Sequence, residues 1–332
     1  MNLFRFVAIA VFSLFNTAMA QEDSKLKFHK PRLIKESAEY EKSPDFEVND
    51  SGQAVFFYGL GSPRNRVWLT KSNKFEDLPE DINRFRGRKI RGDGRLITYG
   101  FKDRLVVYDV AKKSQIVEGT EEMPWGFRRC IFADKATVIG VDSKCVFFKW
   151  ELRQNKFTKL GEMPKDSLAL NHIYSFAPDF SRAIRAGSEN RFTHIDFKTG
   201  KVTEMNDFEE SIAAKNGCSA AENLAVVTKS GKLFFYDFGT QKSQEFKPKK
   251  AMKFSDVYVN DRGNVAVVNG GYLAGDSGFF IFDLQSRPCK MVGHIPMNGL
   301  FNTAKVAISS NGKFVVHSDD ENKQAFLYQI AK

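Results

Sequence analysis

The chain has 332 residues, of which 42% are hydrophobic and 27% charged, a composition that is typical of soluble globular proteins and argues against a largely disordered chain. Its formal net charge of +10 favours anionic over cationic partners. Phenylalanine occurs 32 times and often in adjacent pairs such as Phe56-Phe57, a pattern typical of half-buried strands.

The first twenty residues have the pattern of a cleavable signal peptide. Arg5 is positive, residues 6–15 are almost continuously apolar, and Ala18-Met19-Ala20 fits the small-x-small pattern cut by signal peptidase. An apolar run of about ten residues is too short for a membrane span, which needs roughly twenty. We therefore expect cleavage after Ala20, a secreted or periplasmic protein, and no transmembrane segment in the mature chain.

Short apolar segments recur about every 41 to 46 residues, which matches the length of one four-stranded propeller blade. The recurring segments are Val67–Thr70, Leu105–Asp109, Val146–Trp150, Phe192–Asp196, Leu233–Asp237, Phe279–Asp283 and Phe326–Gln329. Each is preceded by another apolar segment and, before that, by a polar turn such as Asn49-Asp50-Ser51-Gly52, which is a hairpin signal. Strands this short and evenly spaced exclude a βαβ pattern.

The repeats predict an all-β fold, a single seven-bladed β-propeller of four-stranded blades over residues 21–332. The blades are expected to begin near residues 45, 86, 127, 171, 215, 255 and 303. The last repeat stops after its third strand, and Pro31–Lys35 has the pattern of the missing fourth strand. Pairing of this segment with Ala325–Ile330 would close the ring and leave no exposed sheet edge. The alternative is an open solenoid or a pair of β-sandwiches, which would leave unpaired ends.

Several turns resemble those of a known superfamily. Ser175-Phe176-Ala177-Pro178-Asp179 resembles the Phe-Ser-Pro-Asp-Gly turn of tryptophan-aspartate (WD) repeats, and Tyr108-Asp109 resembles the end of their third strand. Residues 196–202, Asp-Phe-Lys-Thr-Gly-Lys-Val, resemble a turn of bacterial YVTN-type and quinoprotein-like propellers. The resemblance covers nearly all of the mature chain and implies a WD-like (WD40-like) propeller. Because these motifs are structural turns, the resemblance implies a fold and no particular activity.

The sequence contains no recognisable catalytic motif. The five histidines show neither HxH nor HExxH spacing, and no CxxC pair, GxSxG elbow or phosphate-binding glycine loop is present. We therefore predict no catalytic residue, no metal site and no cofactor, and favour a non-enzymatic protein. The alternative is a lactonase-like, metal-dependent hydrolase or lyase with a site at the central channel. Its candidate ligands, for which solvated loop charge is the competing interpretation, are Asp276, Asp319, Asp320 and Glu321.

A binding surface is better supported. In a propeller, the linkers between blades and the loops between second and third strands emerge on one face. The candidate ligand-binding residues there are Arg66, Arg86, Arg88, Trp125, Arg128, Arg129, His172 and Tyr174. Arginine recognises planar anions through forked hydrogen bonds, although many of these arginines could equally be surface charge or inter-blade ion-pair partners. We expect a monomer that binds a protein or an anionic ligand; export argues against nucleic acid.

Two further features have structural interpretations. Arg91-Gly92-Asp93 spells an integrin-type tripeptide but stands where each repeat needs a hairpin turn. The four cysteines, Cys130, Cys145, Cys218 and Cys289, are spaced so that we expect free thiols buried as small hydrophobic side chains.

Overall fold

The computed structural model describes residues 26–37, 45–58, 65–78, 82–83, 89–101, 104–118, 127–142, 146–162, 173–177, 182–186, 192–196, 199, 201–205, 218–220, 224–229, 231–272, 277–297, 305–319 and 323–332. The expected signal peptide and its cleavage site lie outside this part of the chain. Over the described residues the regular secondary structure is entirely β, and none of them forms a helix long and apolar enough to cross a membrane.

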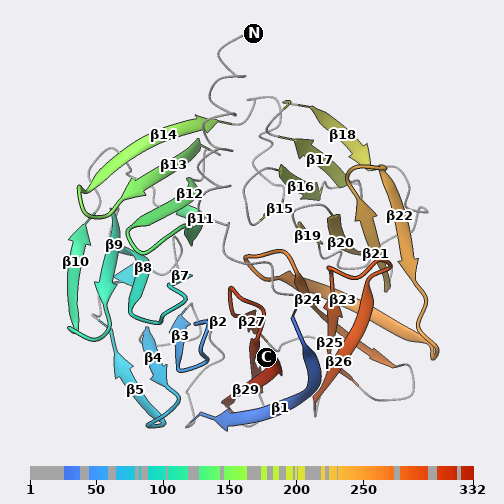
Figure 1. The fold of residues 1–332 in the computed structure, drawn as a ribbon, viewed down its shortest axis with the longest axis horizontal. Helices are drawn as coiled ribbons and strands as arrows, with labels where there is room; N and C mark the ends of the chain where they lie inside the picture. The colour runs from blue at the N-terminus through green and yellow to red at the C-terminus, as the bar shows by residue number, and fades with distance from the viewer. Residues whose placement is uncertain are drawn as a thin grey trace. The chain divides into compact units, whose positions relative to one another are not determined.

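The described strands form seven antiparallel sheets, each named below after its first strand (Figure 1). In five of them, strands that follow one another along the chain lie side by side, as hairpins joined in series. In each sheet, the end of the strands at which the first strand joins the second is called the turn edge. The opposite end, at which the second strand joins the third, is called the loop edge. Both terms refer to the ends of the strands and not to the outermost strands of the sheet. Such four-stranded antiparallel sheets are consistent with a β-propeller.

The first of two compact units comprises Leu33–Leu168 and Ala304–Gln329. It contains the β2, β6 and β11 sheets and most of the β27 sheet. Their strands are β2 (Asp45–Val48), β3 (Ala54–Tyr58), β4 (Arg66–Leu69), β5 (Lys74–Asp77), β6 (Ile82–Asn83), β7 (Lys89–Ile90), β8 (Leu96–Phe101), β9 (Arg104–Asp109), β10 (Ser114–Glu118), β11 (Phe127–Phe132), β12 (Thr137–Asp142), β13 (Val146–Glu151), β14 (Lys156–Glu162), β27 (Val306–Ile308), β28 (Phe314–Asp319) and β29 (Gln324–Ala331).

The second unit comprises Lys25–Arg32, Ala169–Thr303 and Ile330–Lys332. It contains the β15, β19 and β23 sheets. Their strands are β15 (Ile173–Phe176), β16 (Arg182–Ala186), β17 (Phe192–Asp196), β18 (Val202–Met205), β19 (Cys218–Ala220), β20 (Leu224–Lys229), β21 (Lys232–Asp237), β22 (Lys242–Phe246), β23 (Met252–Val259), β24 (Val265–Tyr272), β25 (Ser277–Asp283) and β26 (Lys290–Met297).

The β27 sheet takes its outer strand from the beginning of the chain. Its order is β1-β29-β28-β27, where β1 (Phe28–Glu36) lies beside the C-terminal strand. Hydrogen bonds extend the pairing at both ends: Lys332 N–H donates to the carbonyl of Lys27 (3.1 Å), and Ser37 N–H donates to that of Ala325 (2.9 Å). The sequence prediction that these two segments pair is confirmed.

The β6 sheet differs from the sequence prediction. We expected a single first strand beginning near residue 86, whereas two short segments, β6 and β7, both pair with β8. Between them the sequence runs through three arginines and Gly87, a composition poorly suited to a continuous strand.

The turns between first and second strands recur in detail. Asn49 Oδ1 accepts a hydrogen bond from Ala54 N–H (3.0 Å), and Asn260 Oδ1 accepts one from Val265 N–H (2.9 Å). Each turn closes on a glycine in the left-handed region, which residues with a side chain rarely adopt. The φ angles are 68° at Gly52, 74° at Gly94, 66° at Gly263 and 75° at Gly312. The hairpin turns predicted at these four places are confirmed.

The adjacent phenylalanines are explained by burial on both faces of a sheet. Successive side chains of a strand point to opposite faces. Phe57 therefore packs in a cluster with Val316 and Leu327 of the β27 sheet, while Phe56 packs in another with Ile97 and other residues of the β6 sheet. The same holds in the second unit, where Tyr236 packs in a cluster with residues of the β15 sheet and Phe235 packs in a cluster with residues of the β23 sheet. Strands buried on both faces read as continuous apolar runs.

Polar contacts join the turn edges of successive sheets in the first unit. Asp50, in the β2–β3 turn, accepts a hydrogen bond from Asn311 N–H on the β27 sheet through its carboxylate (2.7 Å). The N–H of Asp50 donates to the carbonyl of Gly92 on the β6 sheet (2.8 Å). Arg91 then donates to the carbonyl of Lys135 on the β11 sheet (2.6 Å). Together these bonds connect the β27, β2, β6 and β11 sheets.

Candidate functional site

The eight predicted ligand-binding residues are described to different extents. Those outside the described part of the chain are Arg86, Arg88, Trp125 and His172. Arg128, Arg129 and Tyr174 have a described backbone position, and Arg66 is described with its side chain. The structure therefore tests their assembly into one surface only through strand register.

Arg128 and Arg129 lie at the start of β11, at the loop edge of the β11 sheet. Phe127 is opposite Asp142 and Arg129 is opposite Val141, so the register shifts at Arg128. One extra residue in one strand of an antiparallel pair is a β-bulge, a feature over-represented beside active sites. Tyr174, in β15, is opposite Arg185 near the loop edge of its own sheet.

Arg66 is held by its own sheet. It is the first residue of β4, and its Nε lies 2.8 Å from Asp77 Oδ1 on β5. Its guanidinium also lies over the ring of Phe75, 5.9 Å from the centroid. The side chain is 28% exposed, and a partly exposed pair of this kind contributes about 0–1 kcal/mol to stability. For this residue the contacts support the ion-pair interpretation more than ligand binding.

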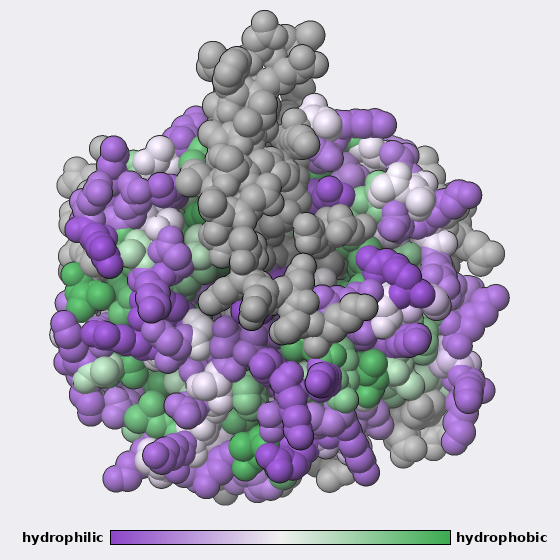
Figure 2. All heavy atoms as spheres, viewed as in Figure 1, coloured by the Kyte–Doolittle hydropathy of each residue, from purple (hydrophilic) through white to green (hydrophobic). Residues whose placement is uncertain are grey.

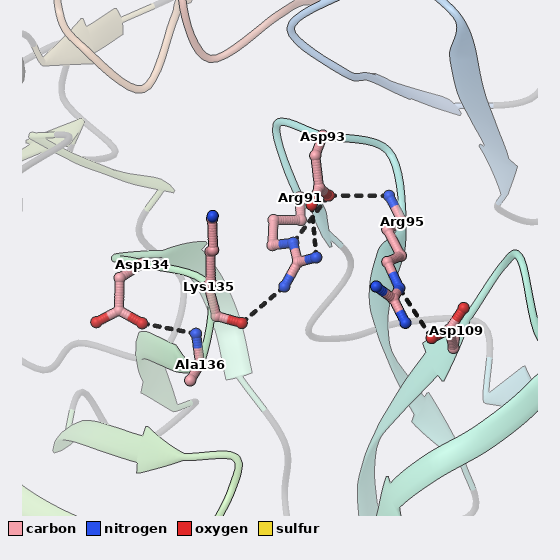
Figure 3. Close-up of polar contacts among 7 residues, drawn as sticks. All are labelled: Arg91, Asp93, Arg95, Asp109, Asp134, Lys135 and Ala136. Atoms are coloured by element: carbon pink, nitrogen blue, oxygen red, sulfur yellow. Dashed lines mark hydrogen bonds and ion pairs between the residues drawn. The ribbon is translucent and has the colours of Figure 1, made fainter.

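A network of charged side chains at the turn edges of the β6 and β11 sheets is fully described (Figure 3). Arg91 donates from Nε and Nη2 to the two carboxylate oxygens of Asp93, at 2.8 and 2.5 Å. Its remaining Nη1 donates to the carbonyl of Lys135. Beside it, Arg95 Nε donates to Asp109 Oδ2 (3.1 Å). The side chain of Arg91 is only 12% exposed, so Arg91 links the two sheets rather than being presented to a ligand.

The same network controls ionisation of its two carboxylates. Burial opposes the charged form of Asp93, but hydrogen bonds from the Arg91 side chain and the Arg95 backbone outweigh it and lower the pKa. Burial likewise opposes ionisation of Asp109. There, hydrogen bonds from Lys112 N–H and the Arg95 side chain lower the pKa below its usual value. Both groups therefore stay ionised and bound to their arginines at neutral pH.

The Arg91-Gly92-Asp93 tripeptide is a structural turn. Arg91 N–H donates to Leu96 O (2.8 Å) and Gly94 N–H to Arg91 O (2.7 Å), which closes the hairpin. The two charged side chains bind each other, so they are not splayed apart for a receptor. The predicted hairpin turn is confirmed.

His194, in the second unit, is a buried histidine with an aromatic neighbour. Only 5% of the residue is exposed, and its ring lies against that of Phe238 with centroids 4.2 Å apart. Arg182 lies over the other ring, Phe238, at 4.9 Å. Burial, followed by the positive charge of Arg182, lowers the pKa of His194 to about 4. The ring is therefore neutral at pH 7.

The described residues contain no obvious metal or redox centre. No three of their histidine, cysteine, aspartate or glutamate side chains are grouped so that they could hold a metal ion. Cys130 and Cys289 are free thiols, as predicted for these two. Cys130 is buried within 3.5 Å of Thr98 Oγ1, and burial raises the pKa of Cys289, which disfavours its reactive thiolate form.

The sequence reasoning missed one charged surface. Five lysines lie together at the loop edges of the β19 and β23 sheets, and all five are exposed. This group, called the lysine patch below, consists of Lys232, Lys247, Lys249, Lys250 and Lys253. The signal was available, because Lys247-Pro248-Lys249-Lys250 is the connection between a fourth and a first strand. Figure 2 shows that one face of the described surface is mainly hydrophilic, with small apolar areas between.

Comparison with known proteins agrees with the fold and does not extend to a function. No family model matches the sequence, and no curated protein matches it. Among solved structures, a chain of hydrazine synthase from Kuenenia stuttgartiensis is similar, with a TM-score of 0.55 and 12% sequence identity. The alignment covers 88% of this chain and 97% of that chain. At this identity the likeness concerns the fold alone, and the chain is an all-β protein of four-stranded antiparallel sheets, consistent with a β-propeller.

Proposed function

We propose that this protein is an exported, non-enzymatic β-propeller that binds a protein or an anionic ligand on its arginine-rich loop face. Its seven sheets would be the blades of one WD-like ring, in which β1 completes the last blade. Three observations support this architecture: hairpins in series within five sheets, the pairing of β1 with β29, and the polar contacts between successive turn edges in the first unit.

The observation that carries the binding proposal is the bulge at the start of β11. It occurs where two consecutive residues, Arg128 and Arg129, stand at a loop edge. A bulge bends its strand and changes the direction of the side chains around it. A guanidinium group offers a forked pair of donors that matches a carboxylate or phosphate, so two consecutive arginines at a bulge are suited to an anionic ligand.

The test uses immobilised heparin as an anionic probe. We expect the mature chain to elute only at raised salt, and the double variant Arg128→Ala/Arg129→Ala to elute at clearly lower salt, because each lost contact reduces the electrostatic attraction. A matched control removes two exposed arginines from turn edges, Arg153→Ala/Arg262→Ala. Identical elution of the two double variants would contradict the proposal.

Metal analysis of the purified protein tests the non-enzymatic part. We expect substoichiometric divalent metal after dialysis. One tightly bound divalent ion per chain would favour the lactonase-like alternative instead, because such enzymes activate water or substrate with a central metal.

A further inference from the structure

The lysine patch lies on neighbouring loop edges of the second unit. β22 ends at Phe246, the connection 247–251 follows (orange in Figure 1), and β23 begins at Met252. Lys232 is the first residue of β21 and stands at the same edge of the β19 sheet, because Leu233 is opposite Phe246. Four lysines within seven residues are thereby joined by a fifth from the adjacent strand.

Short contacts hold the two sides of the patch together. Phe254 N–H donates to the carbonyl of Gly231 in the β20–β21 turn (2.9 Å). The stem of Lys253 lies close to the same glycine: a Cβ added at Gly231 would be 3.2 Å from Lys253 Cγ. Gly231 itself has a φ of 78°, and Pro248 restricts the backbone of the connection. The lysines are therefore displayed from a constrained backbone.

The patch is dense in positive charge: residues 245–253 hold four of its lysines and a single carboxylate, Glu245. Lys232 approaches Glu245 at 3.8 Å, and the two side chains are 48% and 32% exposed. A pair this long and this exposed is screened by water and salt. The other four lysines come from residues whose side chains are exposed to solvent.

The composition of the patch distinguishes between kinds of anionic partner. It contains no arginine, tryptophan or tyrosine, the residues that dominate protein–protein hot spots. The neighbouring aromatic residues, Phe246 and Phe254, pack inward: Phe246 lies against Phe282 with ring centroids 5.0 Å apart, and Phe254 is buried in the same cluster, so neither is presented for stacking on nucleic-acid bases. Lysine carries a hydrated point charge on a flexible stem, which suits a diffuse sheet of negative charge.

We propose that the lysine patch binds the surface of an anionic lipid bilayer. Basic segments near such a surface gain attraction from each lysine without a defined pocket. The patch belongs to other sheets than Arg128 and Arg129, so the inference extends beyond the proposed function and does not depend on it. The bound protein would be peripheral, attached through charge and released by salt.

Sedimentation with sucrose-loaded vesicles tests the proposal. We expect the mature chain to bind vesicles of 70% phosphatidylcholine and 30% phosphatidylglycerol in low salt, and not vesicles of phosphatidylcholine alone. The triple variant Lys247→Ala/Lys249→Ala/Lys250→Ala should bind about 100-fold more weakly, since each lysine near the surface contributes attraction of roughly equal size. Raising the salt to 0.5 M should release the wild-type protein.

Two controls separate this surface from others. The triple variant Lys71→Ala/Lys112→Ala/Lys242→Ala removes the same charge from exposed positions near turn edges and should bind almost as well as wild type. Arg128→Ala/Arg129→Ala should also retain vesicle binding, whatever its effect on heparin. Equal losses in both lysine triples, or equal binding to neutral and anionic vesicles, would overturn the proposal. Binding to poly-glutamate without binding to vesicles would overturn it in favour of an acidic protein partner.

Discussion

Buried charged side chains in this protein are accompanied by opposite charges. Lys89 is 8% exposed, and its Nζ lies 2.9 Å from Glu47 Oε2 on the neighbouring β2 sheet. Asp109 is 2% exposed and pairs with Arg95. Removing one member of such a pair leaves an uncompensated buried charge, which is strongly destabilising. His194 shows the other solution, because it is buried in its neutral form beside a positive arginine.

Stability should therefore fall in mild acid. Between pH 6.5 and about 4, the unfolded chain binds a proton on His194 that the folded chain does not. The free energy of unfolding falls as the pH drops through this window, by on the order of 2–3 kcal/mol. Burial also lowers the pKa of His317, which acts in the same direction. Urea unfolding at pH 7.5 and 4.5 should show a smaller loss in His194→Leu than in wild type; equal losses would exclude His194 as the titrating group.

The Arg91 contacts predict a stability effect. Arg91→Ala removes the hydrogen bond to the Lys135 carbonyl and leaves Asp93 without its bidentate partner. We expect a loss of about 1–2 kcal/mol in the free energy of unfolding, measured by chemical denaturation. Arg153→Ala, at an exposed turn position, serves as control and should change stability by less than about 0.5 kcal/mol. If both variants match wild type, the turn-edge contact contributes nothing to stability.

Within one repeat, local signals predicted the elements well. Polar turns ending in glycine and short apolar runs depend only on neighbouring residues. The left-handed φ at Gly52 and Gly263 agrees with the turns that those signals predict. The split of a first strand into β6 and β7 was not predicted. Contacts between repeats were also beyond reach, since Asp50 and Asn311 are 261 positions apart and no periodicity specifies which side chains meet.

The glycine of a recurring turn should resist substitution. A residue with a side chain at position 94 would have to adopt a φ of 74°, and its Cβ would lie 2.7 Å from Asn49 Nδ2 on the adjacent sheet. We expect Gly94→Ala to lower the free energy of unfolding by about 1–2 kcal/mol from backbone strain alone. Gly239→Ala is the matched control, since its added Cβ would approach the Asp237 carboxylate no closer than 3.3 Å and no left-handed φ is involved. Thermal melting of the two variants compares them directly.

The candidate binding site was harder to predict than the fold. Strands can be identified from repetition because the same pattern of apolar residues recurs in every repeat. A binding residue, in contrast, occurs in one repeat only. Arg66 fitted the pattern of an exposed arginine at a loop edge. In the structure its side chain contacts Asp77 and Phe75 of its own sheet instead. The lysine patch depends on a single connection and one register, which no repeat average reveals.

At the scale of the whole molecule, β1 gives the β27 sheet its outer strand. Without β1, the edge of β29 would be exposed, and an unpaired edge strand is a template for aggregation. A chain beginning at residue 38 should therefore form soluble aggregates or dimers, as measured by light scattering after size-exclusion chromatography. A chain beginning at residue 26, which keeps β1, should remain monomeric. Monomers of equal stability from both chains would contradict this role for β1.

The first twenty residues should be removed when the protein is exported. Expressed in a host with a general secretory pathway, the full chain should appear outside the cytoplasm with Gln21 as its first residue, which N-terminal sequencing determines. Retention of Met1 in the exported protein would contradict cleavage after Ala20.

The pairing of β1 with β29 also limits when the β27 sheet can fold during synthesis. Strand β1 cannot pair until β29 has been synthesised. Lys27 and Lys332 are hydrogen-bonded neighbours, although about 300 residues separate them in the sequence. Contacts of such high sequence separation form slowly. Completion of the β27 sheet is thus deferred until β29 has emerged from the ribosome.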